Sequence, residues 1–211
     1  MKKEVIFIVC AHSDDEAAGM GGTIFKYIDE NKQLIKIIFS FGEQSHPHLK
    51  EEHTKRVRIN ETIKLEKKLG IKTYFLGIKD FKIKEEISSI KLKDKLGNLI
   101  KKYKPKQIFM TSLNDIHRDH RAVAKITLDT AKKIGYDGEI YTYEVWAPRK
   151  ENRPHIYVDI SKYQNKKANL LKSFVSQRFY TYPLLLLYLI KSRFYGKKIN
   201  AKFAERFYKI Q

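Results

Sequence analysis

The chain has 211 residues, of which 42% are hydrophobic and 32% are charged. This composition is typical of a folded globular protein and excludes a disordered one. The length suits one sizeable core, so we predict a single domain over residues 1–211. The single cysteine, Cys10, excludes a disulfide framework, and the sequence runs into its first apolar stretch without a leader-like segment. We therefore expect a cytoplasmic protein.

The formal net charge of +19 is unevenly distributed along the chain. Residues 148–211 hold fifteen Lys or Arg and three acidic residues, whereas residues 1–50 hold six Lys and seven acidic residues. A basic surface attracts nucleic acid, anionic lipid headgroups and phosphorylated substrates without distinguishing them. A Lys-rich, solvated surface is the simplest explanation of this charge. We expect no nucleic-acid partner, because the sequence carries no RNA- or DNA-binding motif.

Short apolar runs alternate with helix-length amphipathic segments along the chain. We predict strands over residues 4–10, 34–41, 72–77, 107–111 and 139–146, with a further strand over 155–160. We predict helices near 17–30, 50–69, 85–103 and 119–134, and we expect the basic segment 160–211 to be helical. This alternation indicates βαβ units, and therefore an α/β fold with a mainly parallel sheet covered on both faces.

Polar residues follow four of the predicted strands. Residues 12–15 follow the first strand, Glu43 follows the second, Asp80 follows the third, and residues 112–120 follow the fourth. Ligands of open parallel sheets bind outside the carboxyl ends of the strands. We therefore expect these four segments to converge at one edge of the sheet and to form the functional site there.

Two of these segments contain the residue types of a metal site. They offer His12, Asp14, Asp15, His117, Asp119 and His120. Adjacent carboxylates beside a buried strand repel each other and lose solvation unless a cation or hydrogen bonds compensate. Two histidines and one carboxylate with an open fourth position form a catalytic zinc arrangement, next to which a second carboxylate can act as a base. The alternative is that an aspartate merely caps the helix that starts near Ala17.

The motifs that carry these residues resemble the signature of the PIG-L/LmbE-like deacetylases, zinc enzymes that remove N-acetyl groups from glucosamine-type sugars. The matching stretches are AHSDDE (11–16), GGTI (21–24), FGE (41–43), RINE (58–61), LG (69–70), DIHRDHRA (115–122), YE (143–144), SQ (176–177) and AERF (204–207). They cover essentially the whole chain in the right order, and the two His/Asp blocks are specific to the family. The resemblance implies a Rossmann-like three-layer sandwich.

Carried over residue by residue, the resemblance implies that His12, Asp15 and His120 bind one zinc ion per chain. It implies that Asp14 is the general base that takes a proton from the attacking water. Because two histidines and one carboxylate also serve iron(II), Fe²⁺ is an alternative to Zn²⁺.

The resemblance also implies roles for three further residues. His117, oriented by Asp119, would stabilise the oxyanion or protonate the leaving amine. Arg58 matches an arginine of the family and would reach the substrate. The alternative for Arg58 is a structural pair with Glu61, which lies one helical turn away.

An apolar run at residues 182–190 lies in the most basic part of the chain. Its nine residues are about half of the ~20 that span a bilayer. We interpret it as a buried helix with Pro183 near its first turn and its leucines in the core. Shallow contact with an anionic membrane surface, and thus a peripheral location at a membrane, is the alternative.

The expected function is that of a zinc-dependent N-deacetylase that releases acetate. The resemblance implies an N-acetylated amino sugar as the partner: an N-acetylglucosamine-containing small molecule, glycoconjugate or lipid-linked sugar. Two alternatives from other classes are a different metal-dependent hydrolase on the same sheet edge, such as a phosphoesterase, and a basic nucleic-acid-binding protein. An oligomer is compatible with the sequence.

Overall fold

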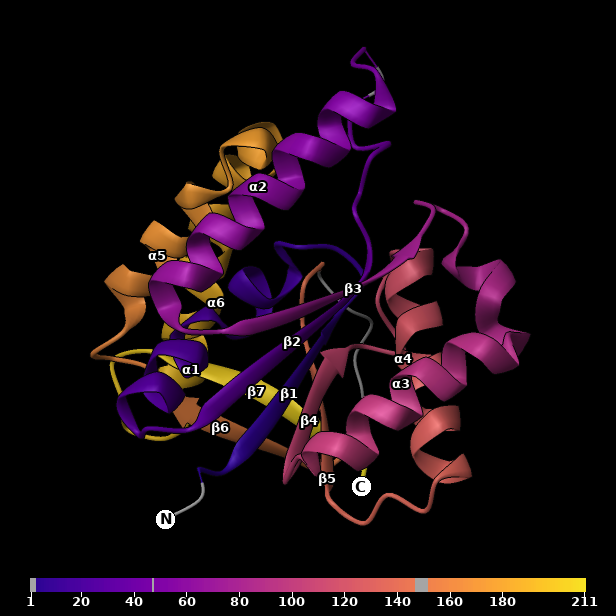
Figure 1. Cartoon of the computed structure of the whole chain (residues 1–211). Helices are drawn as coiled ribbons and strands as arrows, with labels where there is room; N and C mark the ends of the chain where they lie inside the picture. The colour runs from indigo at the N-terminus through magenta and orange to yellow at the C-terminus, as the bar shows by residue number, and fades with distance from the viewer. Residues whose placement is uncertain (1–2, 47, 147–151) are drawn as a thin grey trace.

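The computed structural model describes residues 3–46, 48–146 and 152–211, and a single twisted sheet forms its centre (Figure 1). The sheet has seven strands within these ranges, in the order β3-β2-β1-β4-β5-β7-β6. The strands are β1 (Val5–Cys10), β2 (Gln33–Ser40), β3 (Lys72–Ile78), β4 (Gln107–Thr111), β5 (Glu139–Tyr143), β6 (His155–Asp159) and β7 (Ala204–Lys209). Strands β1 to β5 pair in parallel, and β7 pairs antiparallel with both of its neighbours.

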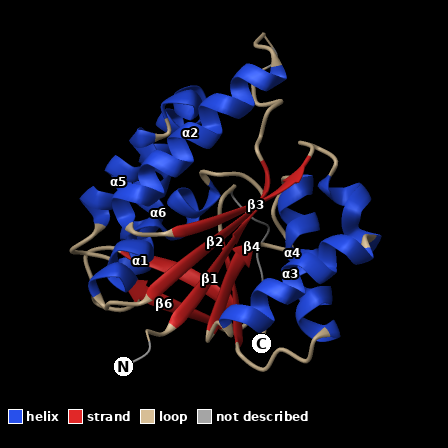
Figure 2. Cartoon of the chain, in the orientation of Figure 1, coloured by secondary structure: helices blue, strands red, loops and turns tan. Residues whose placement is uncertain are grey.

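Helices cover both faces of the sheet, which gives three layers (Figure 2). The helices are α1 (Asp15–Asp29), α2 (Glu51–Leu69), α3 (Ile90–Tyr103), α4 (Arg118–Lys133), α5 (Gln164–Ser173) and α6 (Arg178–Lys197), with short 3₁₀ segments at Ile83–Ser88 and Val175–Gln177. Helices α3 and α4 lie on one face, and α1, α2, α5 and α6 lie on the other. The predicted three-layer α/β fold with a mainly parallel sheet is confirmed.

The alternation of side chains along β1 explains why this strand is apolar throughout. Phe7 and Val9 pack towards α3 and α4, whereas Ile6 and Ile8 pack towards α1 and α5. Successive side chains of a strand point to opposite faces, so a strand covered on both faces needs apolar residues at every position. All six residues of β1 are buried.

The strand order places the site. Strand β1 pairs with β2 on one side and with β4 on the other. From β1 the chain first adds β2 and β3 towards one edge of the sheet, and then adds β4 and β5 towards the other. A crevice for ligands opens where the strand order reverses in this way. The loop after β1 leads into α1, and the loop after β4 leads into α4. The residues of both loops therefore meet at the carboxyl edge of the sheet.

The end of the chain differs from the prediction of a purely helical segment 160–211. After α5 and α6, residues Ala204–Lys209 form β7, which inserts between β5 and β6. The charged residues of this stretch hid the strand, but Glu205 is buried and accepts hydrogen bonds from the backbone N–H groups of Gly22 and Thr23. The strand is held in place by its pairing partners and by this carboxylate.

The prediction that the leucines of 182–190 lie in the core is wrong for three of them. Leu186, Leu187 and Leu189 are exposed on α6. The buried side of this helix instead carries tyrosines, among them Tyr188 and Tyr195. A helix buries only one side when it lies on the outside of a layer, so a continuous apolar run places some apolar residues in solvent. No helix in the described ranges is long and apolar enough to cross a membrane.

Candidate metal centre and catalytic pocket

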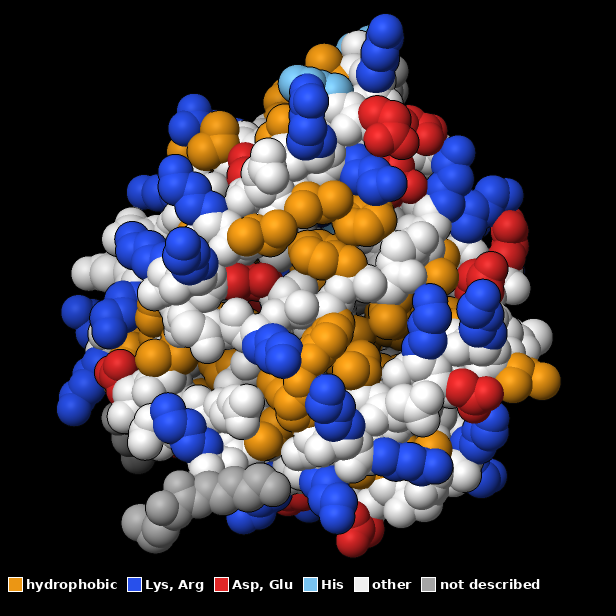
Figure 3. Space-filling view, in the orientation of Figure 1, with side chains coloured by type: hydrophobic (Ala, Val, Ile, Leu, Met, Phe, Trp, Pro, Cys, Tyr) orange, Lys and Arg blue, Asp and Glu red, His pale blue; other side chains and the backbone are white. Residues whose placement is uncertain are grey.

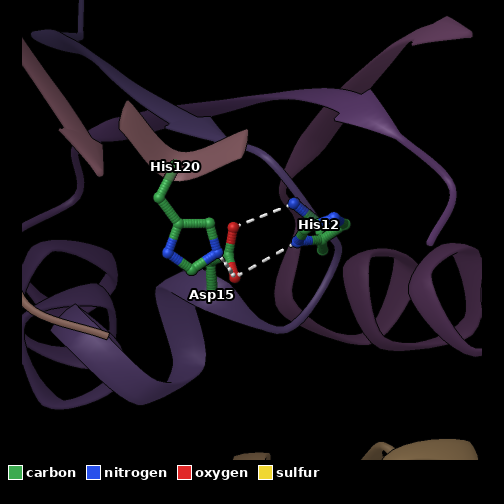
Figure 4. A group of neighbouring side chains, drawn as sticks. All are labelled: His12, Asp15 and His120. Carbon is green, nitrogen blue, oxygen red and sulfur yellow. Dashed lines mark hydrogen bonds and ion pairs between the residues drawn. The ribbon is translucent and has the colours of Figure 1, made fainter. Parts of the chain in front are cut away.

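Two histidines and one aspartate face one another at the carboxyl edge of the sheet (Figure 4). The three ligand atoms that His12, Asp15 and His120 offer lie within 4.8 Å of one another. Oδ1 of Asp15 is 3.2 Å from Nε2 of His120 and 3.9 Å from Nδ1 of His12. The first strand–helix loop delivers His12 and Asp15, and the first turn of α4 delivers His120.

The backbone fixes the orientation of Asp15. Its Oδ2 accepts hydrogen bonds from the backbone N–H groups of Ala11, at 2.9 Å, and His12, at 2.8 Å. Oδ2 is therefore engaged within the loop, and Oδ1 is the oxygen that faces both histidines. This arrangement presents one carboxylate oxygen to a shared ion.

Each of the two histidines has a carboxylate on its other ring nitrogen. Nε2 of His12 lies 3.0 Å from Oδ1 of Asp80, and Nδ1 of His120 lies 3.1 Å from Oδ2 of Asp115. Metal-binding histidines usually donate their second N–H in this way, which fixes the tautomer and raises the basicity of the ligating nitrogen. Sequence reasoning assigned no role to Asp80 or Asp115. Both lie in segments that follow strands, and Asp115 also opens the family-like stretch DIHRDHRA.

The donor set suits a divalent ion of intermediate softness. Two imidazole nitrogens and one carboxylate oxygen match the protein ligands of catalytic zinc sites. A second group, His12 with Asp80 and Asp119, also brings its ligand atoms within 4.8 Å. In that group Asp80 would act as a ligand and could no longer serve as the outer partner of His12. The first group leaves Asp80 beside His12 and Asp115 beside His120, and is the better fit.

Without an ion, the surrounding carboxylates favour the protonated form of His120. Burial alone would lower the pKa of His120, but the carboxylates of Asp15 and Asp115 outweigh it and raise this pKa to about 10. Burial would raise the pKa of Asp15, but the charges of His120 and His12 hold it well below its usual range. A cation that binds here must displace this proton, because a ligating imidazole is neutral.

Asp14 lies beside this group and points away from its own helix. As the residue before α1 it could cap the helix, but its side chain makes no capping hydrogen bond. Its Oδ1 instead accepts from Nη2 of Arg58 at 3.1 Å, and both residues line the same pocket. The neighbouring aspartates therefore have different partners: Asp15 contacts the two histidines, and Asp14 contacts Arg58.

Arg58 reaches Asp14 from α2 and is 2% exposed. The structural pair with Glu61 does not form, because Glu61 accepts hydrogen bonds from the backbone N–H and the hydroxyl of Ser176. The guanidinium of Arg58 packs against Gly42, where an added Cβ would lie 2.8 Å from Cζ of Arg58. Gly42 also has a φ of +67°, so glycine is required there for two reasons.

His117 and Asp119 are in contact, but not as the sequence suggested. The backbone N–H of Asp119 donates to Nδ1 of His117 at 3.2 Å, whereas the Asp119 carboxylate accepts from the backbone N–H of Phe81 at 2.9 Å. Burial, followed by the charges of His120 and His12, lowers the pKa of His117 to about 4. The ring is therefore neutral near pH 7 and carries its proton on Nε2, the nitrogen that does not accept from the backbone.

These groups share a cavity of about 340 Å³. Six of the seven candidate residues line it: His12, Asp14, Asp15, Arg58, His117 and His120. The carboxylate of the seventh, Asp119, lies 4.0 Å from Nε2 of His12. Apolar and aromatic side chains also line the cavity, among them Trp146 after β5 and Leu184 and Tyr188 on α6. The cavity thus combines ionic groups with apolar surface that suits the ring of a bound molecule.

A family model described as "PIG-L: GlcNAc-PI de-N-acetylase" matches residues 7–131, which is more than half of the chain. The chain belongs to the PIG-L family. The matched range includes both His/Asp loops and Arg58. The resemblance that the sequence motifs indicated is confirmed.

Solved structures share the fold of this PIG-L family member over nearly its whole length. N,N'-diacetylchitobiose deacetylase from Pyrococcus horikoshii has a TM-score of 0.81 and 22% identity, and the match covers 98% of this chain and 84% of that one. The hydratase GalB, which acts on 4-carboxy-2-hydroxymuconate in Pseudomonas putida, has a TM-score of 0.81 and 18% identity over 99% and 96% of the two chains. A zinc-inhibited form of teicoplanin deacetylase Orf2 has a TM-score of 0.80 and 11% identity over 97% of each chain. The presence of a hydratase shows that this fold carries more than one chemistry.

Proposed function

We propose that the protein is a metal-dependent N-deacetylase that hydrolyses the acetamide of an N-acetylglucosamine-containing substrate and releases acetate. The substrate is a small molecule, a glycoconjugate or a lipid-linked sugar. The observation that carries the proposal is the pairing of two different aspartates at one loop. Asp15 faces two histidines, and Asp14, next to it in the chain, faces the pocket. Membership of a family described as GlcNAc-PI de-N-acetylase supports the amide bond and the sugar as the target.

His12, Asp15 and His120 would hold the ion, with Zn²⁺ as the first candidate and Fe²⁺ as the second. When bound, such an ion lowers the pKa of a water molecule and polarises the acetamide carbonyl. Asp80 lies at the second ring nitrogen of His12, and Asp115 lies at the second ring nitrogen of His120, so each carboxylate orients one imidazole. The chain contributes the remaining groups that the reaction needs.

Asp14 acts as the general base. It takes a proton from the water that attacks the carbonyl carbon, and it passes this proton to the nitrogen as the C–N bond breaks. Arg58 orients the carboxylate, since Nη2 of Arg58 lies 3.1 Å from Oδ1 of Asp14. The products are a free amine and acetic acid, which ionises to acetate and gives its proton to the amine or to solvent, and Asp14 returns to its starting state.

His117 stabilises the negative oxygen of the tetrahedral intermediate. Its neutral ring accepts a backbone N–H at Nδ1, so Nε2 donates. Such a donor is most valuable when it is held in place before the reaction starts. The hydrogen bond from the backbone N–H of Asp119 to Nδ1 of His117 holds the ring in place. Because its pKa is low, His117 stabilises the oxyanion as a hydrogen-bond donor, and protonation of the amine is left to Asp14.

The test measures acetate release from N-acetylglucosamine, its β-linked dimer and its inositol and lipid conjugates, with the protein loaded with Zn²⁺ or Fe²⁺. We expect Asp14→Asn to keep the metal and to lose activity by about 100-fold or more, because an amide cannot accept the proton. We expect Asp15→Asn to lose the metal. Asp29→Asn, an exposed carboxylate at the far end of α1, is the matched control and should behave as the parent protein.

Two results would overturn the proposal. Phosphate release from a phosphate ester, with two metal ions per chain and no acetate from any sugar, would favour the phosphoesterase alternative. Loss of metal from Asp14→Asn and retention by Asp15→Asn would reverse the roles of the two aspartates.

Asp80→Asn separates the two candidate metal groups: it should weaken metal binding only moderately if His12, Asp15 and His120 are the ligands.

A further inference from the structure

The outward side of α6 exposes a set of large apolar side chains. We call it the α6 apolar face and define it by Leu186, Leu187, Leu189, Ile190 and Phe194. Leu186, Ile190 and Phe194 are 64%, 57% and 55% exposed, and their spacing of four residues aligns them on one side of the helix. Contiguous exposed apolar patches mark surfaces that contact a partner or a membrane.

The segment that forms and flanks this helix carries charge of one sign. The sequence from Ile160 to Phe203 contains ten Lys or Arg and not a single Asp or Glu. Arg193, Lys197 and Lys198 lie on the last turns of α6 and are exposed. Within the described ranges, no carboxylate forms an ion pair with any of these three side chains. Arg193 donates to the backbone carbonyl of Lys202, and Lys198 lies over the ring of Phe194. The α6 apolar face is therefore bordered by positive charge that no described carboxylate neutralises.

Positive charge alone does not distinguish this region. Lys and Arg side chains are scattered over the face of the molecule in Figure 3, with acidic side chains among them. The distinguishing feature of α6 is the combination of exposed apolar side chains with the exposed Arg193, Lys197 and Lys198 at the end of the same helix. This combination is typical of helices that lie in the plane of a membrane interface, where apolar side chains enter the acyl region and Lys and Arg contact anionic headgroups.

We propose that the α6 apolar face docks on an anionic lipid membrane. A second copy of the chain is a poorer occupant, because a two-fold contact would place this basic border against itself. The inner side of the same helix supports a functional link, since Leu184 and Tyr188 line the catalytic cavity. A groove of about 410 Å³ between α5 and α6, lined by both apolar and polar residues, shares Leu171 and Tyr188 with that cavity. Docking through α6 would thus hold the cavity close to the lipid surface.

The first experiment measures sedimentation of the full-length, metal-loaded protein with vesicles. One set of vesicles contains phosphatidylcholine alone, and the other contains phosphatidylcholine with phosphatidylglycerol, both at physiological salt. We expect binding to the anionic vesicles and little binding to the neutral ones. The double variant Ile190→Gln/Phe194→Gln should weaken binding at least about tenfold. The matched control Ile63→Gln/Ile90→Gln, which alters exposed isoleucines of α2 and α3, should not change it.

The second experiment removes the charge and leaves the apolar side chains in place. The triple variant Arg193→Gln/Lys197→Gln/Lys198→Gln should weaken binding to anionic vesicles at least about tenfold, because each basic residue near the surface contributes to the attraction. The matched control removes three exposed lysines of α3: Lys91, Lys95 and Lys101. An equal loss from both triple variants would show that only total charge matters, and would overturn a docking face at α6.

Failure of this proposal is separable from failure of the proposed activity. The α6 variants should release acetate from a soluble substrate at the parent rate, and Asp14→Asn should bind vesicles like the parent protein. The absence of binding to either vesicle type would overturn the proposal. A second result would also overturn it: the parent protein does not bind vesicles, and light scattering shows that Ile190→Gln/Phe194→Gln has a different mass from the parent. That result would assign the face to a second copy of the chain.

Discussion

Oδ2 of Asp115 lies 3.1 Å from Nδ1 of His120, on the opposite side of the ring from Asp15. The same carboxylate accepts a hydrogen bond from the backbone N–H of His117 at 2.8 Å. Asp115 therefore links the ring of one site histidine to the backbone of another. It is buried and lies five residues before His120, in the loop between β4 and α4.

We predict that Asp115→Asn lowers metal affinity about 10- to 100-fold, because a neutral partner makes His120 a weaker ligand. The asparagine oxygen can still accept the backbone N–H of His117, so the loop should keep its shape. Competition with a chromophoric chelator measures the affinity. Asp137→Asn, an exposed aspartate, is the control. Equal affinities of Asp115→Asn and the parent protein would show that His120 is not a ligand held by this pair.

We predict that metal binding releases about one proton near pH 8. In the metal-free protein the pKa of His120 is about 10, so its ring is protonated there and must lose the proton when it binds an ion. The apparent metal affinity should increase by up to about tenfold with each unit of pH increase until the pH reaches about 10, and should then level off. Calorimetry in two buffers of different ionisation enthalpy counts the proton. Binding without proton release at pH 8 would contradict the assignment.

The same shift predicts how the stability of the metal-free protein depends on pH. The pKa of His120 rises from an ordinary value of 6.5 to about 10 on folding, so its contribution to stability is fully present below 6.5. This contribution is lost as the pH rises through 10. Urea denaturation between pH 6.5 and 10 should show a falling midpoint for the metal-free protein. A flat or rising midpoint would contradict it, and Asp115→Asn should flatten the slope.

We predict that Arg58→Lys lowers kcat about tenfold or more while metal content stays unchanged. A lysine ammonium cannot fill the planar slot between Asp14 and Gly42, so the general base loses its fixed orientation. Arg56→Lys, an exposed arginine on the same helix, should be neutral. A rise in KM with unchanged kcat would instead assign Arg58 to substrate binding.

We predict that Glu205→Gln lowers the free energy of unfolding by about 3–5 kcal/mol, because it leaves a buried ammonium unpaired. Oε1 of Glu205 lies 2.7 Å from Nζ of Lys167, and the carboxylate also accepts from Gly22 and Thr23, where α1 is kinked. Urea denaturation measures the change, and Glu30→Gln at an exposed ion pair is the control. A change of less than about 1 kcal/mol would place this pair among the weak surface bridges.

Local patterns were sufficient to predict much of this molecule. Apolar runs of strand length that alternate with amphipathic segments can bury both faces only as a parallel sheet between helices, and the structure has that fold. The same reasoning placed residues 12–15 and 112–120 at one edge, since parallel strands end on the same side. Strand β7 escaped prediction because its buried glutamate is neutralised by Lys167, a partner far away in the sequence.

The sequence by itself determined which chemical groups the site can use, because the order of strands and loops decides which residues reach the sheet edge. Only the tertiary structure decided how each group is used. Asp14 and Asp15 are adjacent and identical in type, yet one is held by an arginine from α2 and the other by the backbone of its own loop. His12 is paired with Asp80 from another loop, and His120 is paired with Asp115 from the loop that leads into its own helix. Helix α6 buries one side and exposes the other. Contacts between distant segments set the direction and charge of a side chain, and neighbouring positions in a sequence carry no information about them.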